Sequence, residues 1–144
     1  MANAIRTADC IPLILWNERN KVIIGLHCGW RGIASGIIEK ALQNDELGIT
    51  HAYIGPHISK DHFEVKRDFI DSFQEYGLNI DRYITVRDGK MYMDLRSLCE
   101  AKLHEKHIKI INKESHCSYT EYDQFFSWRR DKNQSLRNLT IAWF

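Results

Sequence analysis

The sequence predicts an α+β fold, with mixed β-sheets and helices packed on the outside. Two short apolar runs, Ile11–Trp16 and Lys21–Leu26, are separated by a polar turn, which is typical of a β-hairpin. The pair Asp88-Gly89 indicates a second hairpin, because it suits the tight two-residue turns that join antiparallel strands. Strand-like segments outnumber helical ones along the chain, and many of them form hairpins.

The segments between the two hairpins show both helical and extended patterns. Ser35 is expected to cap a helix over Gly36–Leu47, because the apolar residues that follow fall on one helical stripe. Ile49–Ile54 is expected to form a strand that a Gly-Pro pair ends. Lys66–Tyr76 is expected to be helical, since two phenylalanines are spaced four residues apart within it.

The second half of the chain also contains both helical and extended segments. Asp94 is expected to cap a helix that runs through His107, with three leucines facing inward. The strands expected in this half are Ile80–Val86, Lys90–Met93, Ile108–Ile111, Phe125–Arg130 and Leu139–Phe144.

Size and composition limit the class of protein. The 144 residues predict one domain, residues 1–144, with 44% hydrophobic and 27% charged side chains. A net charge of +1 favours neither nucleic acid nor a membrane surface as partner. No apolar run reaches the ~20 residues needed to span a bilayer, and nothing resembles a signal peptide. A cytoplasmic location with free thiols is therefore expected.

The first hairpin is expected to bring a thiol and an imidazole together. Cys10 precedes its first strand and His27 follows its second, so both lie at the same end. Such a pair can bind zinc or act as nucleophile and base; the alternatives are a buried structural cysteine and a structural histidine. Asp9, beside Cys10, is either an orienting group for an imidazole or a turn residue.

Two arginine-containing segments are candidates for anion binding. Arg31 follows Trp30 between glycines, and it either contacts an anion or packs on the indole ring. Arg129 and Arg130, within an aromatic segment, either bind phosphate or belong to an edge strand with charged ends.

Other histidines are weaker candidates. The pattern around His57 and His62 favours an ordinary polar loop over a metal site. His116, next to Cys117, precedes the last strands and is retained as a possible pocket residue.

The motifs Thr7-Ala8-Asp9-Cys10 and His27-Cys28-Gly29-Trp30-Arg31-Gly32 resemble those of the YfiH-like family. This family is also described as laccase-domain or multicopper polyphenol oxidase proteins and as purine nucleoside phosphorylases. The segments Gly55-Pro56, Phe63-Glu64-Val65, Met93-Asp94-Leu95 and Phe126–Arg130, together with Arg137, extend the resemblance over essentially the whole chain. It implies a layered α/β/β/α architecture.

The resemblance also implies a zinc ion held by one cysteine and two histidines. Cys10 matches the cysteine ligand and His27 the second histidine, whereas the motif with the first histidine lies upstream in the family. The chain is therefore expected to be shortened at its N-terminus relative to the family. The third ligand is His57, His62, His116, a group of a neighbouring subunit or absent; we expect it to be absent, with weak zinc binding and with exposed apolar surface that drives homo-oligomer formation.

The activity implied is phosphorolysis of adenosine, inosine or methylthioadenosine, together with adenosine deamination. A nucleoside and phosphate would be the small-molecule partners. Zinc is favoured over copper, because multicopper chemistry needs histidines in sets that this sequence does not show. The alternatives are a Cys–His hydrolase that edits a peptidoglycan precursor, with Cys10 as nucleophile and His27 as base, and an inactive shortened homologue.

Overall fold

A four-stranded mixed sheet forms the centre of the molecule. The computed structural model describes residues 2–144 and orders these strands β3-β2-β4-β8. The first hairpin supplies β2 (Ile11–Asn17) and β3 (Val22–Cys28), which confirms the predicted pairing. The other two strands are β4 (His51–Ile54) and β8 (Lys109–Ile110), which run parallel to each other.

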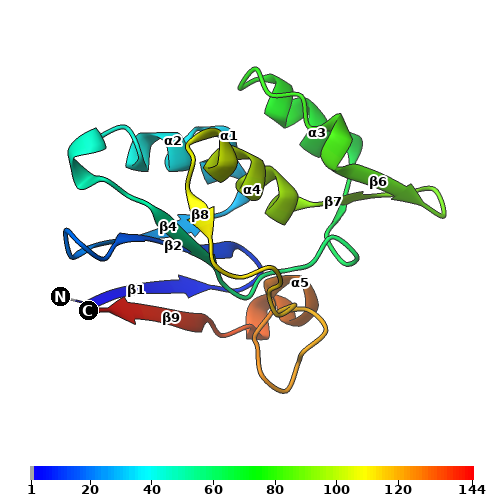
Figure 1. The fold of residues 1–144 in the computed structure, drawn as a ribbon. Coiled ribbons are helices and arrows are strands. Elements are labelled where there is room, and N and C mark those ends of the chain that lie inside the picture. The colour runs from blue at the N-terminus through cyan, green and yellow to red at the C-terminus, as the bar shows by residue number, and fades with distance from the viewer. Residues whose placement is uncertain (1) are drawn as a thin grey trace.

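Helices cover one face of this sheet, as Figure 1 shows. The helices α1 (Trp30–Ala34), α2 (Ile37–Ala41) and α4 (Leu95–Glu105) pack their apolar side chains on the sheet. Removing these side chains from water is the main favourable contribution to the fold. The fully buried residues include Leu13, Leu15, Cys28, Ile33, Ile38, Ile54, Cys99 and Leu103.

A two-stranded sheet covers part of the opposite face. It pairs β1 (Ala2–Thr7) with β9 (Asn138–Trp143) in antiparallel register, so the two ends of the chain lie side by side (Figure 1). Ile5 packs closely over Gly25 of β3, where a Cβ atom would lie 3.0 Å from the isoleucine. The fold class is therefore confirmed as α+β with the helices outside, although no strand was predicted over β1.

A third sheet extends from the side of the molecule in the order β5-β7-β6. It contains β5 (Glu64–Val65), β6 (Ile84–Arg87) and β7 (Lys90–Met93), with α3 (Arg67–Gln74) between β5 and β6 and a short 3-10 turn η2 (Asp81–Tyr83) before β6. The predicted second hairpin is confirmed. Asp88 and Gly89 have φ values of 49° and 73°, as its tight turn requires.

Two predicted elements differ from the structure. The helix expected over Gly36–Leu47 is replaced by α1, α2 and a 3-10 turn η1 (Asp45–Leu47), because Gly36 adopts φ 82° and separates α1 from α2. Ser35 therefore ends α1 instead of beginning a helix.

The strand expected over Phe125–Arg130 is wrong, because these residues lead into helix α5 (Trp128–Asp131). The hydroxyl of Ser127 accepts the Arg130 N–H at 3.2 Å and caps this helix; a 3-10 turn η3 (Lys132–Gln134) follows. By contrast, Asp94 caps α4 as predicted, accepting the Ser97 N–H at 2.9 Å. No helix within residues 2–144 is long and apolar enough to cross a membrane.

Candidate functional site

The register between β2 and β3 brings Cys10 and His27 to the same end of the hairpin. Pro12 lies opposite His27 and Ile11 opposite Cys28, and Cys10 directly precedes this ladder. Alternate residues of a strand share a face, which puts His27 and Cys28 on opposite faces of β3. The Cys28 side chain is fully buried in the core, whereas His27 is exposed.

Gly29 leaves the space that the Cys10 side chain occupies. A Cβ atom at Gly29 would lie 3.1 Å from Cys10 Sγ. Burial raises the pKa of the Cys10 thiol, the Asp9 carboxylate raises it further, and the nearby Arg137 guanidinium lowers it. Arg137, one of the residues that carry the family resemblance, therefore lies close to this end of the hairpin.

Asp9 joins three segments that are distant in the sequence. Its Oδ1 accepts the Ser118 hydroxyl at 2.7 Å, its Oδ2 accepts the Arg129 N–H at 2.6 Å, and its carbonyl accepts the Ile58 N–H at 3.0 Å. Its φ of 86° is unusual for a residue with a side chain, and these bonds hold it there. Asp9 thus bonds to Ser118 and Arg129 in this structure, and no bond to an imidazole occurs within residues 2–144.

Arg31 lies on the adjacent helix α1 and stacks on its neighbour. The centre of its guanidinium lies 4.4 Å from the centre of the Trp30 ring, and the Trp30 ring in turn packs against Phe69 and Phe73. Within residues 2–144 the Arg31 guanidinium makes no hydrogen bond or ion pair. It is exposed, held on an aromatic face and available to an anion.

Arg129 and Arg130 differ in their contacts although they are adjacent. The guanidinium of Arg129 donates one bond, to the Glu64 carbonyl at 2.8 Å, and lies 5.4 Å from the Phe63 ring centre. Arg130 uses all of its N–H donors on the carbonyls of Ser118, Tyr119 and Phe125 and on the Asp131 carboxylate. Arg130 therefore has no donor left for phosphate in this arrangement.

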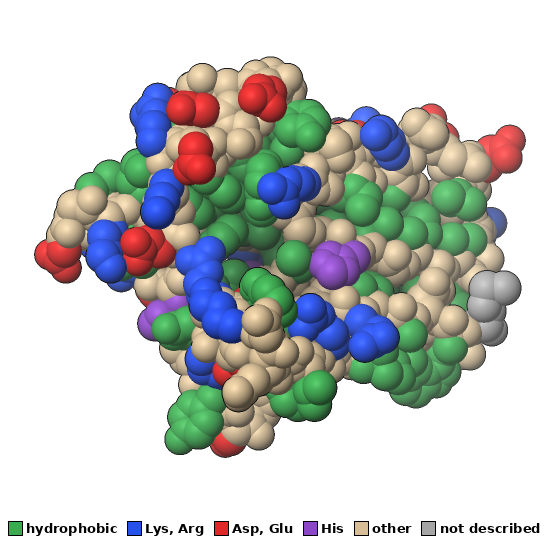
Figure 2. Space-filling model, turned by 180° about the vertical axis from the view of Figure 1, so that it is seen from behind, with side chains coloured by type: hydrophobic (Ala, Val, Ile, Leu, Met, Phe, Trp, Pro, Cys, Tyr) green, Lys and Arg blue, Asp and Glu red, His purple; other side chains and the backbone are tan. Residues whose placement is uncertain are grey.

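A pocket of about 490 Å³ lies between α3 and α5. Trp30, Phe63 and Phe69 provide aromatic surface. The charged residues of the lining are the cations Lys66, Arg129 and Lys132 and the carboxylates Glu64 and Asp68. On the face of the molecule that Figure 2 shows, hydrophobic side chains lie in a hollow with both basic and acidic side chains around it. The aromatic walls suit a planar ligand, and Arg129 can pair with a negative group on such a ligand.

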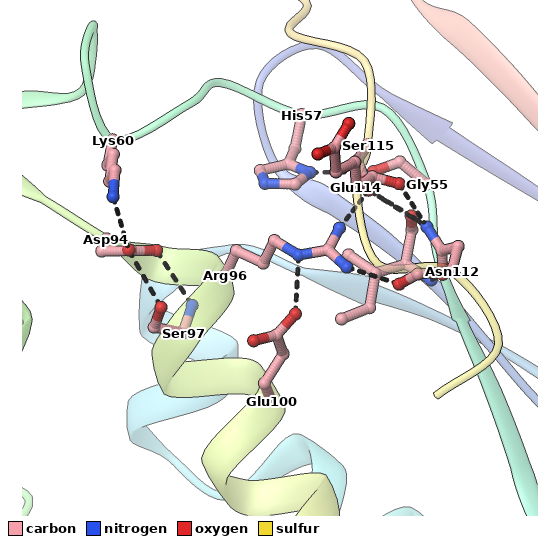
Figure 3. Close-up of polar contacts among 11 residues, drawn as sticks. Gly55, His57, Lys60, Asp94, Arg96, Ser97, Glu100, Asn112, Glu114 and Ser115 are labelled. Atoms are coloured by element: carbon pink, nitrogen blue, oxygen red, sulfur yellow. Dashed lines mark hydrogen bonds and ion pairs between the residues drawn. The ribbon is translucent and has the colours of Figure 1, made fainter. Parts of the chain in front are cut away.

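The other candidate histidines lie in separate surroundings. His57 is buried and its Nδ1 bonds to the Gly55 carbonyl at 2.8 Å, in the cluster around Arg96 drawn in Figure 3. His62 stacks on Tyr119, and His116 Nδ1 bonds to Glu121 at 2.6 Å.

A zinc site in a protein needs at least three protein ligands. Within residues 2–144 no three His, Cys, Asp or Glu side chains are grouped so that they could hold a metal ion. Cys10 and His27 have the right donor chemistry for zinc, but together they supply only two donors. The residues described therefore do not complete a zinc site.

Comparisons with known proteins agree with this architecture. The chain is 30% identical to purine nucleoside phosphorylase YfiH of Escherichia coli K12 over 142 residues, which cover 97% of this chain and 58% of that protein. It is 33% identical to adenosine deaminase RL5 of an unknown prokaryotic organism, covering 94% of this chain and 55% of that protein. The chain thus spans little more than half the length of these relatives.

Solved structures show the same fold. The crystal structure of the Neisseria meningitidis protein NMB0706 matches with a TM-score of 0.83 and 30% identity, covering 99% of this chain and 60% of that one. The YfiH structure of Bacillus licheniformis matches with a TM-score of 0.80 and 25% identity, covering 97% and 56%. Residues 1–144 match the family described as multi-copper polyphenol oxidoreductase laccase, and the chain belongs to this family.

Proposed function

We propose that the chain carries the nucleoside- and phosphate-binding part of a zinc-dependent purine nucleoside phosphorylase with adenosine deaminase-type activity. The observation that carries the proposal is the grouping at one end of β2–β3: Cys10 precedes β2 and packs against Gly29, and His27, Trp30 and Arg31 lie in the same segment as Gly29. Relatives of this chain bear the names purine nucleoside phosphorylase and adenosine deaminase.

In this proposal the arginines bind phosphate and the aromatic rings bind the purine. The Arg31 guanidinium makes no hydrogen bond or ion pair within residues 2–144, so it can bind phosphate without breaking one. Arg129 keeps one bond to the Glu64 carbonyl, which leaves its other donors for the ligand. Trp30 and Phe63, which line the adjacent pocket, offer faces on which a purine can stack.

Arg130 and Asp9 have supporting roles in this proposal. Arg130 holds the loop from Ser118 to Phe125, and Asp9 fixes the start of α5, so both position Arg129. A zinc ion, when bound, would supply an activated water molecule for deamination. Cys10 and His27 would hold that ion, and because they are only two donors we expect residues 1–144 alone to bind zinc weakly.

The alternative of a cysteine hydrolase has less support. A nucleophilic cysteine needs a substantial thiolate fraction at neutral pH, which a lowered pKa provides. Burial and Asp9 instead raise the pKa of Cys10, so the thiol stays protonated unless a metal ion displaces the proton.

The proposal is tested by incubating the chain with adenosine or inosine, with and without phosphate and with and without added zinc. Base release that requires phosphate would support phosphorolysis, and adenosine converted to inosine without phosphate would support deamination. Metal content is measured on the same samples. The full-length E. coli relative is the positive control. If neither product forms and equilibrium dialysis detects no nucleoside binding, the proposal is wrong.

A further inference from the structure

Ser118 is a buried polar residue to which the proposed function assigns no role of its own. It is fully buried, and each of its polar groups has a partner in a different segment of the chain. Its N–H donates to the His57 carbonyl at 3.0 Å, its carbonyl accepts the Arg130 guanidinium at 3.0 Å, and its hydroxyl donates to Asp9 Oδ1 at 2.7 Å. A buried hydroxyl is unfavourable unless it is hydrogen-bonded, so the bond to Asp9 is what stabilises a polar side chain at this position.

The hydroxyl of Ser118 fixes the orientation of the Asp9 carboxylate. A carboxylate group turns easily about the bond that joins it to the side chain, because this torsion has broad minima. Donors on both oxygens prevent the rotation: the Ser118 hydroxyl holds Oδ1, and the Arg129 N–H, at 2.6 Å, holds Oδ2. Without the hydroxyl, the Arg129 N–H would be the only hydrogen-bond donor to this carboxylate within residues 2–144.

The Arg129 N–H lies in the first turn of α5, where backbone donors have no partner within the helix. Ser127 accepts the next donor along, the Arg130 N–H, whereas the Arg129 N–H depends on Asp9. Because α5 has only four residues, a displacement of its first turn displaces the whole helix. The Arg129 guanidinium, which lines the pocket of about 490 Å³ between α3 and α5, would then move with it.

We propose that Ser118 is a positioning residue for the phosphate site and acts on Arg129 through Asp9. The hydroxyl holds the carboxylate, the carboxylate holds the Arg129 N–H, and the backbone of Arg129 then places its guanidinium beside the pocket. Ser118 is fully buried and is not among the residues that line the pocket, so it acts without touching a ligand. The part that concerns phosphate rests on the proposed function, whereas the part that concerns the Arg129 N–H does not.

Amide hydrogen exchange of Arg129, followed by NMR, tests the contact itself. In Ser118→Ala the Arg129 N–H should exchange at least about tenfold faster, because its acceptor is no longer held in place. Ser118→Thr keeps the hydroxyl and should retain the slow exchange. Ser115→Ala is the matched control. It removes a serine hydroxyl that donates to the Ile54 carbonyl at 2.6 Å, in the cluster around Arg96, and should leave the exchange of Arg129 unchanged.

Steady-state kinetics and calorimetric titration with inorganic phosphate test the part that concerns phosphate. Ser118→Ala should raise the KM for phosphate about fivefold and leave kcat and the KM for nucleoside nearly unchanged, since a displaced Arg129 weakens only phosphate binding. The dissociation constant of inorganic phosphate should rise by the same factor, and this measurement needs no turnover. A variant that merely contained less folded protein would instead lose kcat with both KM values unchanged. Ser118→Thr and Ser115→Ala should keep the phosphate affinity of the unmodified chain.

An Arg129 exchange rate that is unchanged in Ser118→Ala would overturn the proposal, and so would equal effects of Ser118→Ala and Ser118→Thr. Faster exchange with an unchanged phosphate affinity would overturn the part that concerns phosphate. If the unmodified chain neither turns over nucleoside nor binds phosphate, the proposed function fails with that part, while the exchange rates still decide the role of the Ser118 hydroxyl. Circular dichroism establishes folding. If Ser118→Ala does not fold, Asp9→Asn tests the same contact by the same exchange measurement, because an amide group keeps only one acceptor oxygen.

Discussion

Two polar regions of this molecule use similar residue types in opposite ways. At the end of β2–β3, His27 and Arg31 are exposed, and the Arg31 guanidinium makes no bond within residues 2–144. In the cluster after β4, Arg96 donates to Glu100, Ser115 and the Asn112 carbonyl, and Asn112 in turn bonds to both the N–H and the carbonyl of Ile54 (Figure 3).

The difference separates groups that can bind a ligand from groups that hold the fold. A side chain whose donors already have partners must break bonds to take a ligand, whereas an unbonded one on a rigid support need not. The same distinction applies to the adjacent Arg129 and Arg130. The predictions below test whether function depends on the first region and stability on the second.

The largest effect is expected from Cys10→Ala. Removing one of the two proposed metal donors should lower zinc-dependent nucleoside turnover at least about 100-fold, while the circular dichroism spectrum stays unchanged. Cys28→Ala is the control, because Cys28 faces the core and not the metal side; it should lower stability but retain activity. Equal losses of activity in both variants would contradict the assignment of Cys10.

Arg96→Ala should mainly affect stability. It removes three bonds from a guanidinium whose side chain is only 15% exposed, and it leaves the Asn112 carbonyl and Glu100 with one partner fewer. We expect a loss of about 2–4 kcal/mol in the free energy of unfolding, measured with urea. A loss of activity in folded protein, without a loss of stability, would show that the cluster after β4 is itself a functional site.

Arg31→Ala, unlike Arg96→Ala, should affect phosphate binding and leave stability nearly unchanged. We expect the KM for phosphate to rise about tenfold, equivalent to about 1.4 kcal/mol, with the unfolding free energy nearly unchanged. Arg130→Ala provides the comparison, since it should destabilise the chain by about 2 kcal/mol through loss of its bonds to the loop. If phosphate dependence is unchanged in Arg31→Ala, the stacking on Trp30 is its only role.

The smallest effect concerns pH. Burial lowers the pKa of His57 in the folded protein, although its bond to the Gly55 carbonyl opposes the shift. The unfolded chain then binds more protons than the folded one as the pH falls below about 6.5, so stability should decrease from that pH downwards. We expect Tm measured from pH 7.5 to 5.5 to fall less in His57→Gln than in the unmodified chain. Equal slopes would show that other groups cause the decrease.

Local patterns in the sequence were sufficient to predict both hairpins and the helix that Asp94 caps. Each depends on residues close together in the chain. The first hairpin needs a polar turn between two apolar runs, and the second needs an Asp-Gly pair. The helix needs the Asp94 side chain, which accepts the backbone N–H of Ser97, three residues further on. The expectation that Cys10 and His27 lie at one end of the first hairpin uses the same local reasoning. The β2–β3 register is consistent with it.

The tertiary structure decided the features that depend on distant partners. Asp9 bonds to Arg129, 120 residues away, and this contact occurs in a segment that forms a helix where the sequence predicted a strand. Arg129 and Arg130 are indistinguishable by residue type, yet only the folded loop around Ser118 uses all of the Arg130 donors. The pairing of β1 with β9 likewise joins the two ends of the chain, and no local pattern specifies such a contact, because its favourable interactions exist only once the intervening chain has folded.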